Sequence, residues 1–324
     1  MSGFRPDTPI HGFQRQDVIP DVTLKVFFNG LLKIVAKIFL RLNMETSQRV
    51  NRADLKLNTT IVRELLVRFI KDQTTNAGFT KAVIGISGGV DSAVSAALAS
   101  EALGKENVLG VMIPYRTSNP KSVEDAMLVI RATGIQSELV DITKMVDGYC
   151  EDNKITDSLR RGNVMARMRM IVLYDLSARE KALVIGTSNK TEILVGYGTQ
   201  HGDLASAINP VGDLYKSQIW QLAEALGVPK SVIEKAPSAD LWEGQTDEKE
   251  MGVTYAKLDA LLYEMVDERH SDEELVKMDF DASFIKKIRV TIQKNQFKRR
   301  PPVIAKVSYR TVNVDFRYVR DWGI

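Results

Sequence analysis

Short apolar runs alternate along this chain with longer amphipathic segments in which apolar residues return every three or four positions. The short runs predict strands and the longer segments predict helices. Strands are expected at 82–86, 108–113, 137–140 and 182–186, and helices at 61–71, 91–103, 122–133 and 157–179. Regular alternation of strand and helix is typical of an α/β fold, a doubly wound parallel sheet with helices on both faces. Ligands of such sheets bind outside the carboxyl ends of the strands, where Ser87, 114–116 and Thr187 would emerge.

The pattern changes beyond residue 199, where glycine and proline introduce loops. Helices are expected at 215–226, 255–266 and 284–297, with an acidic stretch at 247–250. We expect these later segments to cover the carboxyl edge of the sheet and not to form a second domain.

Residues 1–43 differ from the rest of the chain and are expected to form an N-terminal extension, with the main domain at 44–324. Their apolar part, 24–42, carries basic residues that would gather on one helical face. It is too interrupted to span a bilayer and does not resemble a secretory signal peptide. Three interpretations stay open: a helix docked on the domain or on a second copy, an upstream extension with Met44 as the working start, and a membrane-surface helix. Membrane contact is the least favoured of these.

Composition and charge narrow the classes of function. The 324 residues are enough for one large domain with appendages. A net charge of +3 gives no general nucleic-acid footprint, so no nucleic-acid partner is expected. The one cysteine, Cys150, excludes an internal disulfide framework and indicates a cytoplasmic protein. The three histidines lack the spacing of zinc ligands.

The six residues from Ser87 to Ser92, Ser-Gly-Gly-Val-Asp-Ser, join the first expected strand to the following helix. Glycines let backbone amides close on an anion, and the helix start adds partial positive charge, so the junction predicts a phosphate cradle. Asp91 stands close to where the Walker loop has its lysine. A carboxylate beside phosphates requires a magnesium ion between them. A plain helix cap would explain the glycines and Ser87 but not Asp91.

Three further charged positions are candidates for chemistry. The helix with Arg160 and Arg167 on one face presents either phosphate ligands or a solvated basic face, and the residues alone favour neither. Glu192 follows a strand and one helical turn, so its carboxylate could share Mg²⁺ with Asp91 or stabilise its own helix dipole. Lys216 lies at a helix start, where a cation opposes the dipole, and this favours an anionic ligand.

Two motifs carry a family resemblance. The loop from Ser87 to Ser92 resembles the signature of the ATP pyrophosphatase, or PP-loop, family, and Gly162 to Arg169, Gly-Asn-Val-Met-Ala-Arg-Met-Arg, resembles a helix of the NAD synthetases. Further segments similar to NAD synthetases follow in the same order, at 113–118, 186–192, 212–216, 237–241 and 315–318. The resemblance covers most of the chain from about residue 59 and implies a sheet of the adenine nucleotide alpha hydrolase-like type.

The resemblance also implies roles for individual residues. Those expected to contact ATP are Gly85, Ile86, Ser87, Gly88, Gly89, Val90, Asp91, Ser92, Arg116, Thr187, Lys216 and Ser238. Those expected to contact deamido-NAD are Arg167, Asp203 and Lys298. Asp91 and Glu192 would ligate Mg²⁺, and Lys216 would stabilise charge on the leaving pyrophosphate. Gln200 and Ala207 depart from the lysine and aspartate common in ammonia-using members, while 196–203 resembles the synthetase half of glutamine-using ones.

The implied reaction is ATP-dependent amidation of deamido-NAD to NAD by ammonia through an acyl adenylate, with release of AMP and pyrophosphate. No side-chain nucleophile is needed. Residues 1–43 cannot hold the fused amidase domain of the glutamine-using relatives, so free ammonia or a separate glutaminase is expected to supply the nitrogen. A homodimer is also implied. Two alternatives stay open: another PP-loop activity, such as tRNA modification or GMP synthesis, and an ATP-binding regulatory protein without turnover.

Overall fold

The computed structural model describes residues 55–242 and 244–312, which belong to one compact unit, Arg52–Ile324. The expected helix at 24–42 and the segment at 315–318 lie outside the described residues. The strands are β1 (Lys81–Gly85), β2 (Val108–Met112), β3 (Gln136–Leu139) and β4 (Ala182–Ile185). The helices that alternate with them are α2 (Thr59–Asn76), α3 (Val90–Leu103), α4 (Pro120–Thr133), α5 (Thr143–Asp152) and α6 (Ser158–Glu180).

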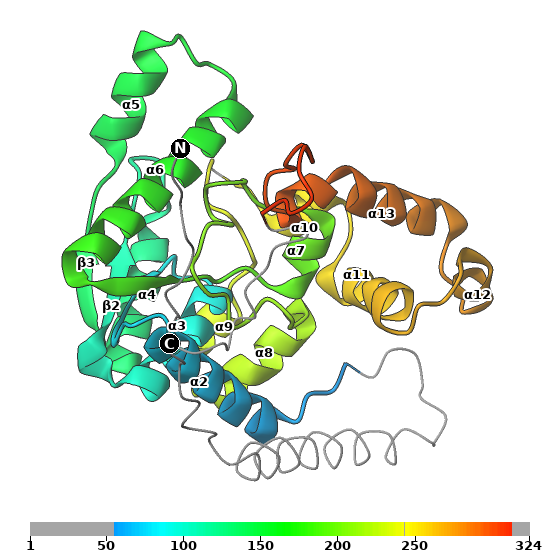
Figure 1. Ribbon diagram of the computed structural model, residues 1–324, viewed down its shortest axis with the longest axis horizontal. Coiled ribbons are helices and arrows are strands. Elements are labelled where there is room, and N and C mark those ends of the chain that lie inside the picture. Colours follow the sequence, from blue (N-terminus) through cyan, green and yellow to red (C-terminus); the bar gives the residue numbers. More distant parts are fainter. Residues whose placement is uncertain (1–54, 243, 313–324) are drawn as a thin grey trace, which may run out of the picture. The chain divides into compact units, whose positions relative to one another are not determined.

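The four strands form one parallel sheet in the order β3-β2-β1-β4, of which Figure 1 labels β2 and β3. Helices α2, α3 and α4 pack over one face and α5 and α6 over the other, so the predicted doubly wound fold is confirmed. The register pairs Ala82 with Val108 across β1 and β2. This order leaves the loops after β1, β2 and β4 as neighbours at one edge of the sheet.

Strand β1 is buried on both faces of the sheet, which explains its continuous apolar run. Ala82 and Ile84 pack in the core cluster that contains α2 and α3. Val83, between them, packs in the opposite cluster with residues of α6. A strand buried on both faces has no polar positions to alternate with, so it forms a continuous apolar run.

The part of the chain after β4 is helical. It contains α7 (Lys190–Val195), α8 (Lys216–Ala225), α9 (Lys230–Ile233), α10 (Asp247–Met251), α11 (Tyr255–Leu262), α12 (Asp272–Lys277) and α13 (Ala282–Lys294). Short turns are η1 (Lys105–Asn107), the π-helical η2 (Tyr263–Asp267) and η3 (Gln296–Arg299). Helices α7, α11, α12 and α13 share a third apolar cluster beside the sheet (Figure 1). The helix expected at 255–266 corresponds to two elements. Its first part is the α-helix α11, and its last part is the π-helical turn η2.

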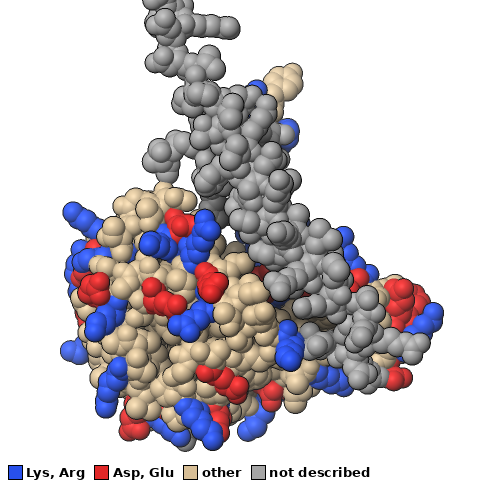
Figure 2. Space-filling view, turned by 90° about the horizontal axis from the view of Figure 1, so that it is seen from below, with Lys and Arg blue, Asp and Glu red and all other residues tan. Residues whose placement is uncertain are grey.

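Charges on the surface are mixed. On the face shown in Figure 2, lysines and arginines are interspersed with aspartates and glutamates. None of the helices in the described ranges 55–242 and 244–312 has the length and apolar character to cross a membrane.

Candidate active site

The glycine loop after β1 has a backbone that only glycine adopts easily at one position. Gly88 has φ +76°, and a Cβ atom there would lie 2.2 Å from the carbonyl oxygen of Ser122 at the start of α4. Gly89, by contrast, has φ −96° as the residue before α3. The loop therefore needs glycine at Gly88 for its conformation and for the close approach of α4.

Two serine hydroxyls close the same loop. The Oγ atoms of Ser87 and Ser92 lie 3.1 Å apart, and the Ser92 hydroxyl donates to the Gly89 carbonyl at 2.9 Å. The Gly89 amide donates to Ser87 Oγ at 3.2 Å. These bonds hold the chain in a tight turn at the start of α3, whose first amides have no acceptor within the helix. A loop of this geometry can bind phosphate oxygens.

Three charged side chains from separate elements meet beside the loop. The Lys216 ammonium, at the start of α8, lies 2.6 Å from Asp91 Oδ2 of α3 and 3.4 Å from Glu192 Oε1 of α7. Lys216 is 2% exposed, whereas its two partners keep 18% and 16% of their side-chain surface exposed. The structure thus brings Asp91, Glu192 and Lys216 together, with both carboxylates aimed at one point.

Asn189 links the two acidic residues. Its Nδ2 donates to Asp91 Oδ1 at 2.9 Å, and its Oδ1 accepts from the Glu192 amide at 3.0 Å. Glu192 returns a carboxylate oxygen to the Asn189 amide, which completes a capping box at the start of α7. Glu192 therefore caps its own helix, as one interpretation holds, and also contacts Lys216, while its sharing of Mg²⁺ with Asp91 stays a prediction.

Burial and charge shift the ionisation of this cluster. Burial raises the pKa of Glu192, the nearby Asp91 carboxylate adds to this rise, and the Lys216 ammonium opposes it. Burial alone would lower the pKa of Lys216, but the Asp91 and Glu192 carboxylates outweigh it and the pKa is raised. Lys216 is therefore held as a cation between two acids. An ammonium fixed at this place can stabilise negative charge that develops on a phosphate.

Other residues expected to contact ATP lie on loops near the same edge. Arg116 lies in the loop after β2, but its side chain is 53% exposed and its guanidinium pairs with Asp147 at 3.0 Å. Thr187 is separated from the end of β4 by Gly186 and is half-buried. Ser238 is exposed, and its Oγ accepts from the Asp240 amide at 3.1 Å. Their roles as ATP contacts stay predictions.

The arginines of the basic helix α6 have two kinds of surroundings. Arg169 donates to the Ile113 carbonyl at 3.1 Å, and Arg161 donates to the Ile155 carbonyl at 3.0 Å. Arg160 and Arg167 are exposed, and among the described residues no side chain is bonded to the Arg167 guanidinium. Arg161 and Arg169 thus bond to backbone carbonyls, and the dinucleotide contact of Arg167 stays a prediction.

The other two predicted dinucleotide contacts meet at one loop. The Lys298 ammonium donates to the carbonyls of Gly196 and Gly198 at 2.7 and 2.8 Å. Asp203 accepts from the Thr199 amide at 2.8 Å and so holds the same loop from its other end. Their contact with substrate stays a prediction, but both residues shape the loop that follows α7.

Two residues that support the site through α7, Asn295 and Arg299, could not be found from the sequence pattern. Arg299 donates to the carbonyls of Leu194 and Ile193, at 2.6 and 3.1 Å, and Asn295 donates to that of Val195 at 2.8 Å. Together they satisfy the end of α7, the helix that carries Glu192. A basic residue near the C-terminus of the chain usually indicates solvated charge, so no local signal predicted this contact.

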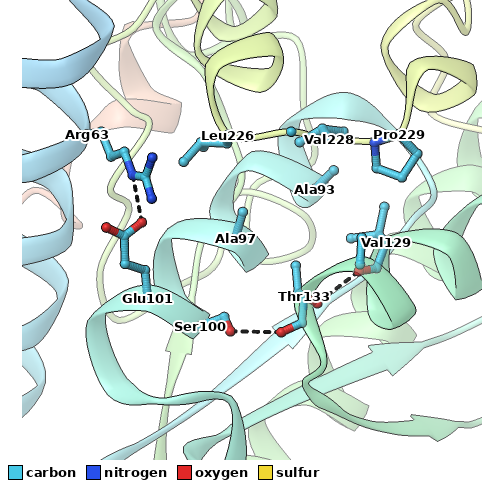
Figure 3. Close-up of a pocket in the computed structure, with 12 residues that line it drawn as sticks. Arg63, Ala93, Ala97, Ser100, Glu101, Val129, Thr133, Leu226, Val228 and Pro229 are labelled. Carbon is cyan, nitrogen blue, oxygen red and sulfur yellow. Dashed lines mark hydrogen bonds and ion pairs between the residues drawn. The ribbon is translucent and has the colours of Figure 1, made fainter.

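One pocket in the described residues lies away from the predicted site. It has a volume of about 250 Å³ and lies between α2, α3, α4 and the turn after α8 (Figure 3). Ala93, Ala97 and Val129 line it, and the Arg63–Glu101 ion pair stands at its rim. None of the predicted site residues lines this pocket.

A glycine loop at a helix start, with paired carboxylates and a buried lysine at the carboxyl edge of a doubly wound sheet, defines an ATP-using α/β protein of the PP-loop class. Residues 62–302 match the family model described as NAD synthase, and the chain belongs to this family. It is 57% identical over 269 residues to the NH(3)-dependent NAD(+) synthetase of Trichlorobacter lovleyi, covering 83% of this chain and 98% of that protein.

Two solved structures have a similar fold. The NH3-dependent NAD synthetase of Campylobacter jejuni matches with a TM-score of 0.67 and 35% identity, over 78% of this chain and 100% of that one. The NMN synthetase of Francisella tularensis matches with a TM-score of 0.69 and 32% identity, over 77% of this chain and 99% of that one.

Proposed function

We propose that this protein is an ammonia-dependent NAD synthetase, a ligase that amidates deamido-NAD at the expense of ATP. The observation that carries the proposal is the convergence of Asp91, Glu192 and Lys216 beside the glycine loop, at 2.6 and 3.4 Å from one ammonium nitrogen. This arrangement suits an ATP whose phosphates rest on the loop. The curated relatives are named NH(3)-dependent NAD(+) synthetase, which supports this activity.

The chemistry explains why the site holds charge stabilisers and needs no nucleophile. A carboxylate oxygen is a poor leaving group, so the nicotinate carboxylate first attacks the α-phosphorus of ATP and pyrophosphate leaves. Ammonia then attacks the acyl carbon, and AMP departs with the former carboxylate oxygen. Negative charge grows on pyrophosphate in the first step. We propose that the Lys216 ammonium and the amides of the glycine loop stabilise this charge.

Asp91 and Glu192 fit a magnesium ion. Their oxygens approach a common cation from α3 and α7, and oxygen donors are the ligands that Mg²⁺ prefers. We propose that they hold Mg²⁺ together with phosphate oxygens and water. When bound, the ion neutralises charge on the phosphates. Ser87 to Ser92 would then cradle those phosphates, with Thr187, Arg116 and Ser238 as further ATP contacts.

The same proposal includes the assembly of the protein and its cellular setting. Apolar side chains of α5 and α6 are exposed, including Tyr149 at 50%, Leu159 at 63% and Ile171 at 48%, and we propose that they meet a second copy in a homodimer. A Leu159→Glu variant should then sediment as a monomer, whereas the unchanged chain sediments as a dimer. The buried free thiol of Cys150 supports a cytoplasmic setting.

The decisive experiment is incubation of the purified chain with ATP, Mg²⁺, ammonia and deamido-NAD. We expect NAD and AMP in equal amounts, and the absence of both would overturn the proposal. A parallel reaction with the deamidated mononucleotide tests the activity named for the F. tularensis relative, and we expect the dinucleotide to react faster. Replacing ammonia by glutamine should abolish the product, unless a separate glutaminase is added.

A further inference from the structure

A buried carboxylate of α11 connects the two helix starts of the site. Asp259 is fully buried, and its Oδ2 accepts from the amide and the hydroxyl of Ser217 on α8, at 2.8 and 2.6 Å. Its Oδ1 accepts from the hydroxyl of Thr191 on α7 at 2.6 Å. One side chain thus bonds to two separate helices.

Thr191 extends this connection to the backbone of Lys216. Its Oγ1 donates to Asp259 and accepts from the Lys216 amide at 3.1 Å, so one buried hydroxyl lies between α7 and α8. Thr191 immediately precedes Glu192, and Ser217 immediately follows Lys216. The bonded residues are therefore sequence neighbours of the two groups that face each other in the site.

Burial of the Asp259 carboxylate costs more free energy than burial of an apolar side chain at the same place would. Asp259 makes no ion pair with any residue that the structure describes, although burial of an unpaired carboxylate is expensive. An apolar side chain at this place would fill the same space at lower cost, but it would leave the two helix starts without a fixed register. Directional hydrogen bonds set that register.

We propose that Asp259 and Thr191 are positioning residues, which hold the starts of α7 and α8 so that Glu192 and Lys216 face each other. Neither residue is placed to touch substrate. The inference rests on the proposed ligase function, because the value of the alignment lies in the groups it presents to ATP. A displacement of about 1 Å at such groups is enough to lower the turnover rate roughly 100-fold.

The test uses the full chain with Thr191→Val, which keeps the shape of the side chain but removes the hydroxyl. The change leaves the Lys216 amide and Asp259 Oδ1 without their partner. Thr191→Ser restores a hydroxyl. Thr74→Val is the matched control, because Thr74 is equally buried on α2 and its hydroxyl is bonded to no described residue.

For Thr191→Val we expect a kcat about 30-fold lower, with KM for deamido-NAD changed by less than about threefold. Binding of an ATP analogue with a methylene bridge between the α- and β-phosphates, measured by calorimetry, should weaken about tenfold. Thr191→Ser should recover kcat and binding to within about threefold, and Thr74→Val should match the unchanged chain in both.

A folded Thr191→Val protein that keeps kcat and analogue affinity within twofold of the unchanged chain would overturn the inference. So would an equal loss in Thr74→Val, because the effect would then reflect a lost hydroxyl anywhere in the core. If Thr191→Val does not fold, Ser217→Ala carries the test, since it removes one bond and leaves the amide bond to Asp259 in place. Its kcat should fall about fivefold, and an unchanged value would overturn the inference.

The two proposals fail in different ways. If the unchanged chain makes no NAD but binds the ATP analogue, the ligase function is wrong while the binding arm still tests the network. If the unchanged chain makes NAD and Thr191→Val does so equally well, only the positioning role is wrong.

Discussion

The glycine loop and the charged cluster beside it are built in opposite ways. The loop is closed by bonds between near neighbours, such as the Ser87 and Ser92 hydroxyls, which are five residues apart. The cluster joins residues that are far apart in the chain: Lys216 and Asp91 are separated by 125 positions, and Asn189 and Asp91 by 98. The loop is therefore a property of a short sequence, whereas the cluster exists only after the sheet has formed.

This difference predicts different responses to mutation. The backbone of the loop must adopt one conformation under a close neighbour, so replacement of Gly88 should lower stability in addition to disturbing the proposed phosphate contacts. The cluster places one cation between two acids, so substitutions there should act mainly on the reaction.

Removal of the central cation should have the largest effect. Lys216→Ala leaves Asp91 and Glu192 facing each other without a counter-charge, and it removes the group proposed to stabilise pyrophosphate. We expect kcat/KM to fall about 1,000-fold, as measured by NAD formation under steady-state conditions. The matched control is Lys190→Ala, because Lys190 also pairs with two acids, at 3.1 and 2.6 Å, but outside the cluster.

The control should keep kcat/KM within about fivefold of the unchanged chain, because its pairs stabilise the fold and do not face the phosphates. A Lys216→Ala enzyme with more than a tenth of the original activity would contradict the proposed role. Equal losses in the two variants would mean that any paired lysine near α7 has the same effect.

Gly88→Ala should have the next largest effect. Its φ is +76°, and the new Cβ atom would meet the Ser122 carbonyl oxygen at 2.2 Å. The strain and the forced shift of α4 should lower the free energy of unfolding by about 3 kcal/mol, measured by urea denaturation. Gly89→Ala is the control, because its φ is −96° and the nearest atom to its Cβ lies at 3.4 Å.

Gly89→Ala should cost about 1 kcal/mol or less, since only the weak preference for glycine before a helix is lost. Equal destabilisation by the two alanines would show that the loop is limited by its glycine content and not by the conformation at Gly88.

The same contrast explains how much the sequence could predict. Strands buried on both faces leave continuous apolar runs, so β1, β2 and β4 were placed within a residue or two. Helices α5, α9, α10 and α12 were missed, and α5 and α12 show why. Helix α12 has one fully buried apolar residue, Leu275, and α5 buries only Val146 and Cys150. Helices α5 and α12 have only 10 and 6 residues, which is shorter than the window of about 11 residues over which a helical period can be recognised.

The residues of the site show the same difference between local signals and contacts that are distant in the sequence. The loop and Asp91 were predicted because their signal is local, and Glu192 and Lys216 were placed through short motifs and a family resemblance. Asp259 was not predicted, because an aspartate inside a helix has no local feature that distinguishes a buried network from a solvated face. Its partners Thr191 and Ser217 lie 68 and 42 positions away.

Arg299→Met tests whether the far end of α7 also depends on distant residues. Arg299 donates to the carbonyls of Ile193, Leu194 and Ile292, so the change leaves three acceptors without this donor. We expect the free energy of unfolding to fall by about 2 kcal/mol, measured by urea denaturation. Arg300→Met, at an exposed neighbour, should change it by less than about 0.5 kcal/mol, and equal effects would refute a specific cap.

The smallest effect should come from an ion pair on the surface. Arg63 and Glu101 join α2 to α3 at 2.8 Å, a distance close to that of Lys216 and Asp91, but their side chains are 44% and 39% exposed. Solvent screens such a pair, so Arg63→Ala should lower the free energy of unfolding by no more than about 0.5 kcal/mol and leave kcat/KM unchanged. Urea denaturation and steady-state assays check both. A larger loss would mean that distance alone decides the value of an ion pair in this fold, whereas the expected result assigns the importance of Lys216 to its burial between two acids.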